Sequence, residues 1–240
     1  MNKALVVGAS GATGRLVVEQ LLSKDVNVLA IVRQADALSG LATQHQSLQV
    51  VVGNVDEWTT SDFKHHLADC NIVISCLGHN LSFKGIFGAP RRLVTDTIDK
   101  IVKAITELAK PNKTRLILMN TSGNANRDIP ERPELSQRIV IGLLRYTLPP
   151  HVDNESAADL LRLELAQAHP YIEWVAVRPD ALTDEESVSP YSVHPSPTRN
   201  AIFNSGASSR INVAHFMARL AIEEEPWEQW KGQMPVIYNA

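Results

Sequence analysis

The chain alternates short apolar runs with longer segments in which apolar residues recur every three or four positions. The first run, Lys3 to Val7, leads through three glycines into a periodic segment from Leu16 to Leu22. Apolar runs of this length, without polar alternation, favour strands of a parallel sheet that is covered on both faces. The other predicted strands are 27–33, 48–52, 72–77, 114–120, 172–178 and 235–238.

The periodic segments between these runs predict helices. After the first, these are 35–41, about 60–68, about 91–109, 136–148 and 211–224. Pro149-Pro150 is expected to end the helix over 136–148, and Asp153 or Asn154 to cap a helix that continues to His169. Strands that alternate with helices in this way predict an α/β fold, a doubly wound parallel (Rossmann) sheet with helices on both faces.

We expect one domain over residues 1–240. The stretch 183–209 turns to Ser, Pro, Asp and Glu between regular elements, which indicates a loop-rich insertion rather than a linker. Residues from about 150 to 210 are therefore expected to contribute most of a small C-terminal substrate lobe.

The glycines after the first run form the most informative pattern in the chain. Gly8, Gly11 and Gly14 stand between a predicted strand and a predicted helix. In that position a glycine turn brings backbone N–H groups at a helix N-terminus toward a pyrophosphate. Glycines also mark ordinary turns, but here the strand before and the helix after both favour a nucleotide-binding turn.

Ligands of open α/β sheets bind outside the carboxyl ends of the strands, so the residues that end each strand are the candidates for cofactor contact. The second strand ends in Arg33, where a carboxylate would indicate NAD. An arginine there can pair with the 2′-phosphate of NADP, although it can also be a solvated residue at a strand end.

Two further strand ends, after the third and fourth strands, carry polar or small residues. Asn54 and Asp56 can contact an adenine ring or merely shape a turn. Gly78 allows a ligand to approach the backbone closely. Cys76 is better interpreted as a small buried apolar residue than as a nucleophile.

Composition narrows the classes of partner. The 240 residues are 44% hydrophobic and 20% charged, with a net charge of −3, which gives no reason to expect nucleic acid or an anionic membrane. Neither a membrane-length apolar run nor a signal peptide is visible, and Cys70 and Cys76 do not suggest a disulfide framework. The expected setting is the cytoplasm and the expected state a monomer or homodimer. We find no spacing for metal ligands and no Gly-x-Ser-x-Gly elbow of a hydrolase.

Taken together, the glycine turn, Arg33, the run Gly53-Asn54-Val55-Asp56 and the run Arg178-Pro179-Asp180-Ala181-Leu182-Thr183 resemble the atypical short-chain dehydrogenases/reductases. The nearest branches are the NmrA-like and the biliverdin-reductase-B (flavin reductase)-like NAD(P)H-binding proteins. The resemblance covers nearly the whole chain. It implies NADP(H), or else NAD(H), as cofactor. The cofactor contacts that it implies are Gly8, Ser10, Gly11, Ala12, Thr13, Gly14, Arg33, Asn54, Val55, Cys76, Leu77, Gly78 and Pro179.

The sequence departs from the wider superfamily at the Tyr-x-x-x-Lys pair that passes a proton. Alignment on the stretch from Ala158 to Arg162 puts His151 and Glu155 at those two positions. His151 can be a proton donor, a residue that orients the following helix, or a surface histidine. Ser122 occupies the place of the superfamily's substrate-binding serine, where it can bind a carbonyl group or satisfy the local backbone.

Two functions follow. The chain is either a reductase that passes hydride from NADPH to a flavin, quinone or carbonyl compound, or a non-catalytic NADP(H) sensor of the NmrA type that binds a partner. An epimerase or dehydratase is a weaker third, because those reactions depend more on the missing tyrosine. The stretch from His79 to Arg92, with Phe83 and Phe87, is expected where a substrate or lid lies, although these aromatics can equally be core.

Overall fold

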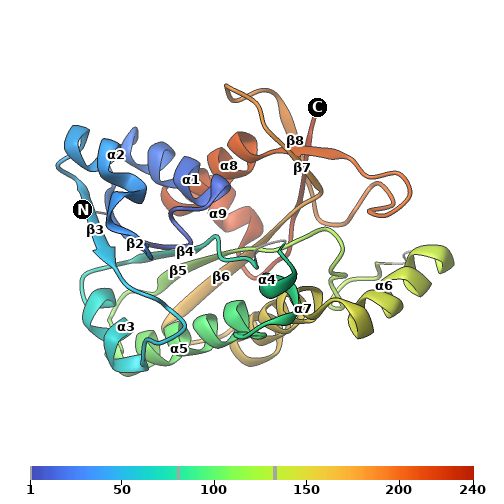
Figure 1. Ribbon diagram of the computed structural model, residues 1–240, viewed down its shortest axis with the longest axis horizontal. Helices are drawn as coiled ribbons and strands as arrows, with labels where there is room; N and C mark the ends of the chain where they lie inside the picture. Colours follow the sequence, from blue (N-terminus) through green and yellow to red (C-terminus); the bar gives the residue numbers. More distant parts are fainter. Residues whose placement is uncertain (1, 80–81, 132–133) are drawn as a thin grey trace.

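The computed structural model describes residues 2–79, 82–131 and 134–240. Its centre is an eight-stranded sheet with the order β3-β2-β1-β4-β5-β6-β10-β8 (Figure 1). All neighbours pair in parallel except β10 and β8. The strands are β1 (Lys3–Val7), β2 (Asn27–Val32), β3 (Leu48–Val52), β4 (Ile72–Ser75), β5 (Thr114–Met119), β6 (Ile172–Pro179), β8 (Tyr191–His194) and β10 (Val236–Asn239).

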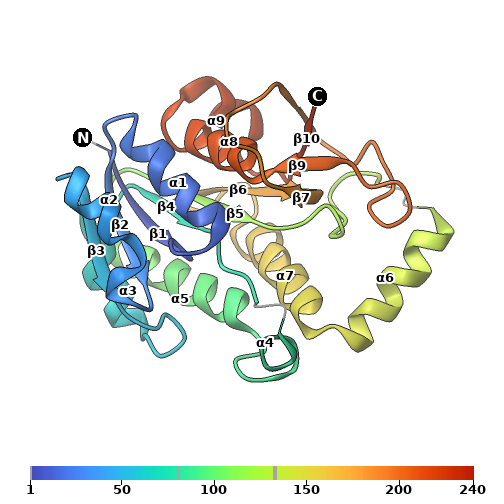
Figure 2. The same cartoon turned by 45° about the horizontal axis from the view of Figure 1, so that its top comes forward.

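Helices cover both faces of the sheet, as the sequence predicts (Figures 1 and 2). One layer holds α1 (Ala12–Leu22), α8 (Arg210–Ile222) and α9 (Glu224–Trp230). The other layer holds α3 (Thr60–Leu67), α5 (Leu93–Leu108) and α7 (Pro149–Asp159). The remaining helices are η1 (Ala35–Leu38), α2 (Ser39–Gln44), α4 (Phe83–Phe87) and α6 (Leu135–Thr147), and a π-helical turn, η2 (Leu160–Leu165), extends α7. The predicted doubly wound α/β fold is confirmed.

The central strand β1 shows how the apolar runs build two cores. Ala4 and Val6 point to the α1–α8 side, whereas Leu5 and Val7 point to the α3–α5 side. All four side chains are fully buried, because successive residues of a strand alternate between its faces and both faces are covered. In a sheet that is covered on both faces, the middle strands do not alternate between apolar and polar residues. The sequence shows this pattern, because its predicted strands are uninterrupted apolar runs.

The helix that carries His151 begins earlier than predicted. Pro149 and Pro150 do end α6, but they are also the first two residues of α7, so Asp153 and Asn154 lie inside the helix and do not cap it. Proline fits the first helical turn, where its missing N–H group would have no partner within the helix. The helix also ends before His169, at the π-helical turn that closes with Leu165.

The other differences are elements that the sequence analysis missed. The stretch expected to be irregular before α5 contains α4, and α9 follows α8 after a one-residue break. The loop-rich insertion carries β8 and β9 (Ala207–Ser209), of which β9 pairs with β7 (Ala181–Thr183). These strands have three or four residues each, too short for a visible period. Residues 149–179 supply α7 and β6 to the main layers, so 181–209 is the part that remains for a lobe. None of the described helices has the length and apolar character needed to cross a membrane.

A buried arginine ties the second half of the chain to the sheet. Arg178, at the end of β6, is fully buried and forms an ion pair with Glu131 at 2.6 Å. Its guanidinium also donates to the backbone oxygens of Asn124, Pro195 and Met234. A buried charge is tolerated only when it is paired and its donors are satisfied, and here each guanidinium nitrogen has an acceptor.

We expect Arg178→Met to lower the free energy of unfolding by about 3–5 kcal/mol, because it strands the buried carboxylate of Glu131. Urea unfolding of the variant and the native protein measures the difference. The control is Arg15→Met, which removes an exposed pair with Glu19 and should change stability by less than about 0.5 kcal/mol. Equal effects of the two substitutions would contradict the role given to Arg178.

Candidate cofactor and acceptor site

The carboxyl ends of four parallel strands open into one cavity of about 500 Å³. Residues from the turns after β1, β2, β3 and β4 line it, and residues of the α4 segment cover it from the other side. The lining contains nine of the thirteen residues that the sequence nominates for the cofactor: Gly8, Ser10, Gly11, Arg33, Asn54, Val55, Cys76, Leu77 and Gly78. Ala12, Thr13 and Gly14 form the first turn of α1 beside it.

The glycine turn is held too tightly for any side chain at two of its positions. Gly8 has φ of +74°, and a Cβ atom there would lie 2.6 Å from the backbone of Cys76. A Cβ atom on Gly14 would lie 2.1 Å from the carbonyl oxygen of Gly8. Gly8 therefore lets β1 pass close to β4, and Gly14 lets α1 start directly against the turn.

The N-terminus of α1 is free to receive an anion. Its cap residue, Gly11, offers no side-chain hydrogen bond, and the first turn of the helix contains no acidic residue. The first N–H groups of a helix and its dipole favour negative charge at that end. These features fit the pyrophosphate of a dinucleotide.

Arg33 and Gly78 mark the open parts of the cavity. Arg33 is exposed, lines the cavity and is in no ion pair with a described residue. Gly78 has nothing within 4 Å of the place where a Cβ atom would be. The turn after β3 is more constrained, since the side-chain amide of Asn54 donates to Glu57 and the backbone oxygen of Asp56 accepts from Lys100.

Cys76 lies in the wall of the cavity as an unreactive thiol. Burial raises the pKa of Cys76 to about 12, so the thiolate that nucleophilic attack requires does not form near neutral pH. The interpretation of Cys76 as a small apolar residue agrees with this environment.

A buried carboxylate joins the cavity to helix α7. Asp153 accepts hydrogen bonds from the backbone N–H groups of Val94 and Thr95, and so caps α5 from 58 or more residues away. The same side chain bonds Nε2 of His79 at 2.8 Å, and His79 lines the cavity. From the sequence alone, Asp153 or Asn154 is expected to cap its own helix, and Pro149 at the first helical position is the signal against this expectation.

Ser122 lies outside this cavity, in a neighbouring one of about 510 Å³ between the turn after β5 and residues 196–204. It is buried, and its hydroxyl donates to Asp180 at 3.0 Å. The other oxygen of Asp180 accepts from the N–H group of Gly206, so the carboxylate also holds the C-terminal loop. Pro179 is next to this site rather than in the cofactor cavity, and its carbonyl accepts from the N–H group of Ser122.

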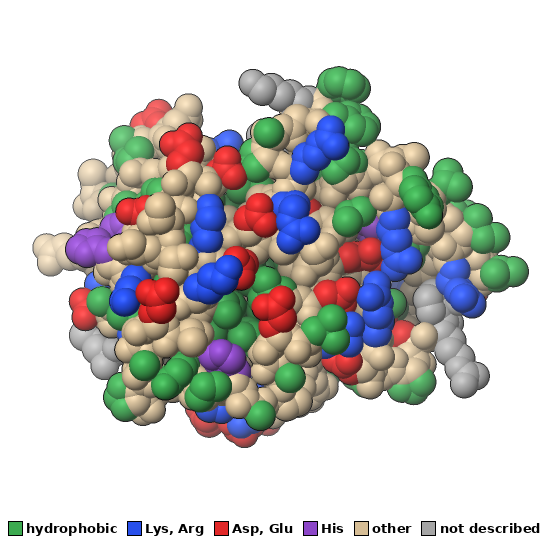
Figure 3. All heavy atoms as spheres, turned by 90° about the horizontal axis from the view of Figure 1, so that it is seen from below, with side chains coloured by type: hydrophobic (Ala, Val, Ile, Leu, Met, Phe, Trp, Pro, Cys, Tyr) green, Lys and Arg blue, Asp and Glu red, His purple; other side chains and the backbone are tan. Residues whose placement is uncertain are grey.

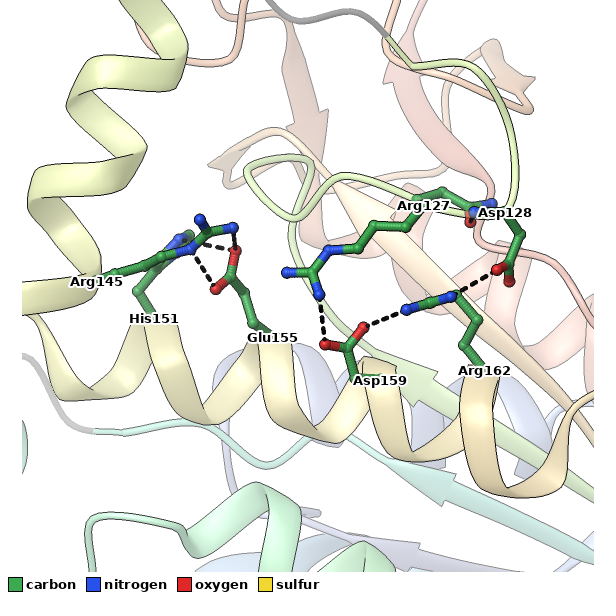
Figure 4. Close-up of polar contacts among 8 residues, drawn as sticks. Arg127, Asp128, Arg145, His151, Glu155, Asp159 and Arg162 are labelled. Atoms are coloured by element: carbon green, nitrogen blue, oxygen red, sulfur yellow. Dashed lines mark hydrogen bonds and ion pairs between the residues drawn. The ribbon is translucent and has the colours of Figure 1, made fainter.

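His151 is buried in the first turn of α7, which excludes the surface alternative. Its Nε2 lies 3.5 Å from Glu155 Oε1, and the fork of Arg145 on α6 grips the same carboxylate at 2.8 and 2.9 Å (Figure 4). Burial raises the pKa of Glu155, but the nearby His151 ring and the hydrogen bonds from Arg145 outweigh burial and lower the pKa to about 2. A Cβ atom on Gly123, the neighbour of Ser122, would lie 3.8 Å from His151 Cε1. The two catalytic candidates thus belong to one region.

A separate cluster of charged residues lies one helical turn further along α7. Asp159 pairs with Arg127 and Arg162, and Arg162 also pairs with Asp128 (Figure 4). On the face of the molecule seen from below, charges of both signs alternate with exposed apolar side chains (Figure 3). Such mixed surfaces create no strong field of one sign. Among the residues described, no group of histidine, cysteine and acidic side chains could hold a metal ion.

The comparisons with known proteins agree with the cavity. Residues 8–224 match the model of a family described as NAD(P)H-binding. The chain therefore belongs to the NAD(P)H-binding family, and the predicted resemblance is confirmed at this level. No curated protein matches the sequence.

Solved structures resemble the chain over nearly its whole length. A wide-type short-chain dehydrogenase/reductase from Veillonella parvula, in complex with NADP, is 14% identical, with 99% of this chain and 94% of that chain covered and a TM-score of 0.70. An anaerobilin reductase from Escherichia coli O157:H7 is 20% identical, with 99% and 97% covered and a TM-score of 0.67. A candidate NADH-flavin reductase from Streptococcus pneumoniae is 18% identical, with both chains fully covered and a TM-score of 0.63. At these identities the likeness shows a shared fold.

We expect Gly14→Ala to abolish NADPH binding and to destabilise the fold, because the new methyl group would overlap the Gly8 carbonyl. Fluorescence titration with NADPH and thermal unfolding measure the two effects. Gly40→Ala is the matched control: its methyl group meets nothing within 4 Å, and alanine is favoured over glycine in helix α2. NADPH binding by Gly14→Ala that equals the native protein would show that the turn does not hold the cofactor.

Proposed function

We propose that the protein is an NADPH-dependent reductase of a small acceptor, with the acceptor bound beside Ser122 and His151. The observation that carries the proposal is the buried imidazole of His151, which lies 3.5 Å from the Glu155 carboxylate and next to the turn that follows β5. The cofactor cavity ends at the neighbouring strand β4. A buried histidine with an oriented ring is a chemically suitable proton donor.

The residues of the cavity have divided roles in this proposal. The glycine turn and the N-terminus of α1 bind the pyrophosphate, and Arg33 binds the 2′-phosphate through a charge-assisted fork. Gly78 lets the cofactor approach the end of β4. His79, fixed by Asp153, contributes a polar edge to the same cavity. When bound, NADPH supplies the hydride, and the protein positions the acceptor to receive it.

In this proposal His151 supplies the proton. An acceptor that gains a hydride also needs a proton at the atom where negative charge develops. The imidazolium of His151 can give that proton and recover one from water. Carbonyl acceptors depend on this step more than flavins or quinones do, since water can protonate a reduced flavin or quinone.

The alternative is an NADP(H) sensor without turnover, and one observation favours it. The hydroxyl proton of Ser122 is directed to Asp180, and so the serine does not present a free donor to a carbonyl group. In the sensor, the same cofactor cavity would serve binding alone, and a partner protein would respond to its occupancy.

We expect Arg33→Asp to weaken NADPH binding about 100-fold and to leave NADH binding nearly unchanged, because only the 2′-phosphate pairs with the guanidinium. Titration of cofactor fluorescence gives both dissociation constants. The control is Arg92→Asp, an exposed arginine that does not line the cavity and pairs with Asp96. Equal loss for both cofactors would argue against a 2′-phosphate site at Arg33.

The reductase itself is tested by NADPH oxidation with FMN, a soluble quinone and an aromatic aldehyde as acceptors. We expect steady turnover with at least one of them, and a fall in kcat of about 100-fold in His151→Asn for an aldehyde acceptor, with NADPH affinity retained. Tight NADPH binding without oxidation by any acceptor would sink the reductase and favour the sensor.

A further inference from the structure

We propose that Glu155 is the positioning residue for the His151 ring and that Arg145 holds Glu155 in that role. This inference rests on the proposed function, because it concerns the proton that His151 gives to the acceptor. It assigns a task to the pair that replaces tyrosine and lysine at these positions, and to an arginine that lies outside the α7 helix.

The geometry of the ring supports the first half of the proposal. His151 and Glu155 are one helical turn apart on α7, and both side chains are largely buried, with 8% and 13% exposed. Nε2 faces the Glu155 carboxylate and makes no hydrogen bond to a described residue at the present separation. A carboxylate that faces one ring nitrogen fixes which nitrogen carries the hydrogen and leaves the other for proton exchange. Here Nδ1 is the nitrogen left for the acceptor.

Arg145 fixes the carboxylate in turn. Its Nε donates to Oε2 and its terminal NH2 group donates to Oε1, the oxygen that also faces His151. A two-point fork of this kind prevents rotation of the carboxylate. A largely buried carboxylate without such a partner would destabilise the folded protein, so Arg145 also stabilises Glu155 in its buried position.

The arginine also moderates the effect of the carboxylate charge. A lone carboxylate beside an imidazolium stabilises the protonated ring, and this opposes release of the ring proton to the acceptor. A carboxylate whose charge is shared with Arg145 orients the ring and competes less for the proton. The other charged groups of this region, Arg127, Glu131 and Arg138, line the adjoining cavity of about 760 Å³ together with Arg145 and Glu155.

The proton balance of the step is simple. Bound NADPH would supply the hydride that the acceptor gains and would leave as NADP+. His151 gives the proton from Nδ1 to the acceptor atom that gains negative charge, and the neutral ring takes a proton from water. Glu155 stays ionised throughout, in keeping with its lowered pKa.

Glu155→Gln tests the first half, with Asp159→Asn as its matched control. Asp159 is the next carboxylate along the same face of α7 and is paired with arginines, but it does not face His151. We expect Glu155→Gln to lower kcat about tenfold with unchanged NADPH affinity, and to move the NMR titration midpoint of the His151 Cε1 proton to lower pH by about one unit. Asp159→Asn should change neither value.

Arg145→Gln tests the second half in the opposite direction. It leaves the Glu155 charge uncompensated, so the His151 midpoint should move to higher pH while kcat falls a few-fold. A merely structural role would lower the thermal unfolding temperature of these variants without moving either midpoint. That outcome, or midpoints that move equally in Asp159→Asn, overturns the proposal.

The NMR readout separates this proposal from the proposed function, because it needs no turnover. Shifted midpoints in a protein that oxidises NADPH with no acceptor would leave Glu155 as a positioning residue and remove the reductase. Native turnover that is unchanged in Glu155→Gln, with an unmoved midpoint, would keep the reductase and remove the positioning role.

Discussion

The arrangement of the site depends on one buried carboxylate. Asp153 takes its hydrogen bonds from the first turn of α5 and from His79, and it projects from the helix that carries His151. A single side chain thereby connects the cavity that His79 lines, the N-terminus of α5 and helix α7. Because a buried carboxylate must keep its donors, these three parts cannot shift independently without a large cost in free energy. The position of His151 on α7 therefore depends on the elements that surround the cavity.

The charged residues of the second half fall into two kinds with different tasks. Arg178 and Glu131 have buried side chains that are fully bonded to one another and to nearby backbone, and they hold the strand ends together. Arg145 and Glu155 lie at the margin of a cavity, where one oxygen is shared with an imidazole. The first pair gives rigidity, whereas the second tunes a neighbour. Both are arginine–carboxylate forks, so the fork alone does not distinguish them; the His151 ring beside the Glu155 carboxylate does.

The sequence predicted the parallel strands of the sheet, most of the helices that cover it, and the glycine turn between β1 and α1. These features are local: an apolar run specifies a covered strand, and glycines between a strand and a helix specify the turn. The sequence did not predict the roles of Asp153 and Arg145, because each acts on a partner in another helix. Asp153 bonds residues 58 or more positions away, and no local pattern records such a contact. The start of α7 was misplaced because Pro149 both ends one helix and begins the next. His79 was predicted only as part of the stretch from His79 to Arg92, because the sequence of that stretch has no periodic pattern.

The position of β10 has a consequence for how the chain comes to be folded. This strand is the last of the sheet in sequence, yet it lies inside the sheet between β6 and β8. The first six strands of the sheet can pair in the order in which a ribosome delivers them, and the glycine turn forms among the earliest. β8 has no strand beside it until residues 236–239 have been synthesised, so the edge of β6 stays open during that interval. An open edge is the part of a nascent sheet that most readily pairs with other chains. This side of the sheet is therefore completed only after β10 has been synthesised, whereas the strands around the glycine turn can pair earlier.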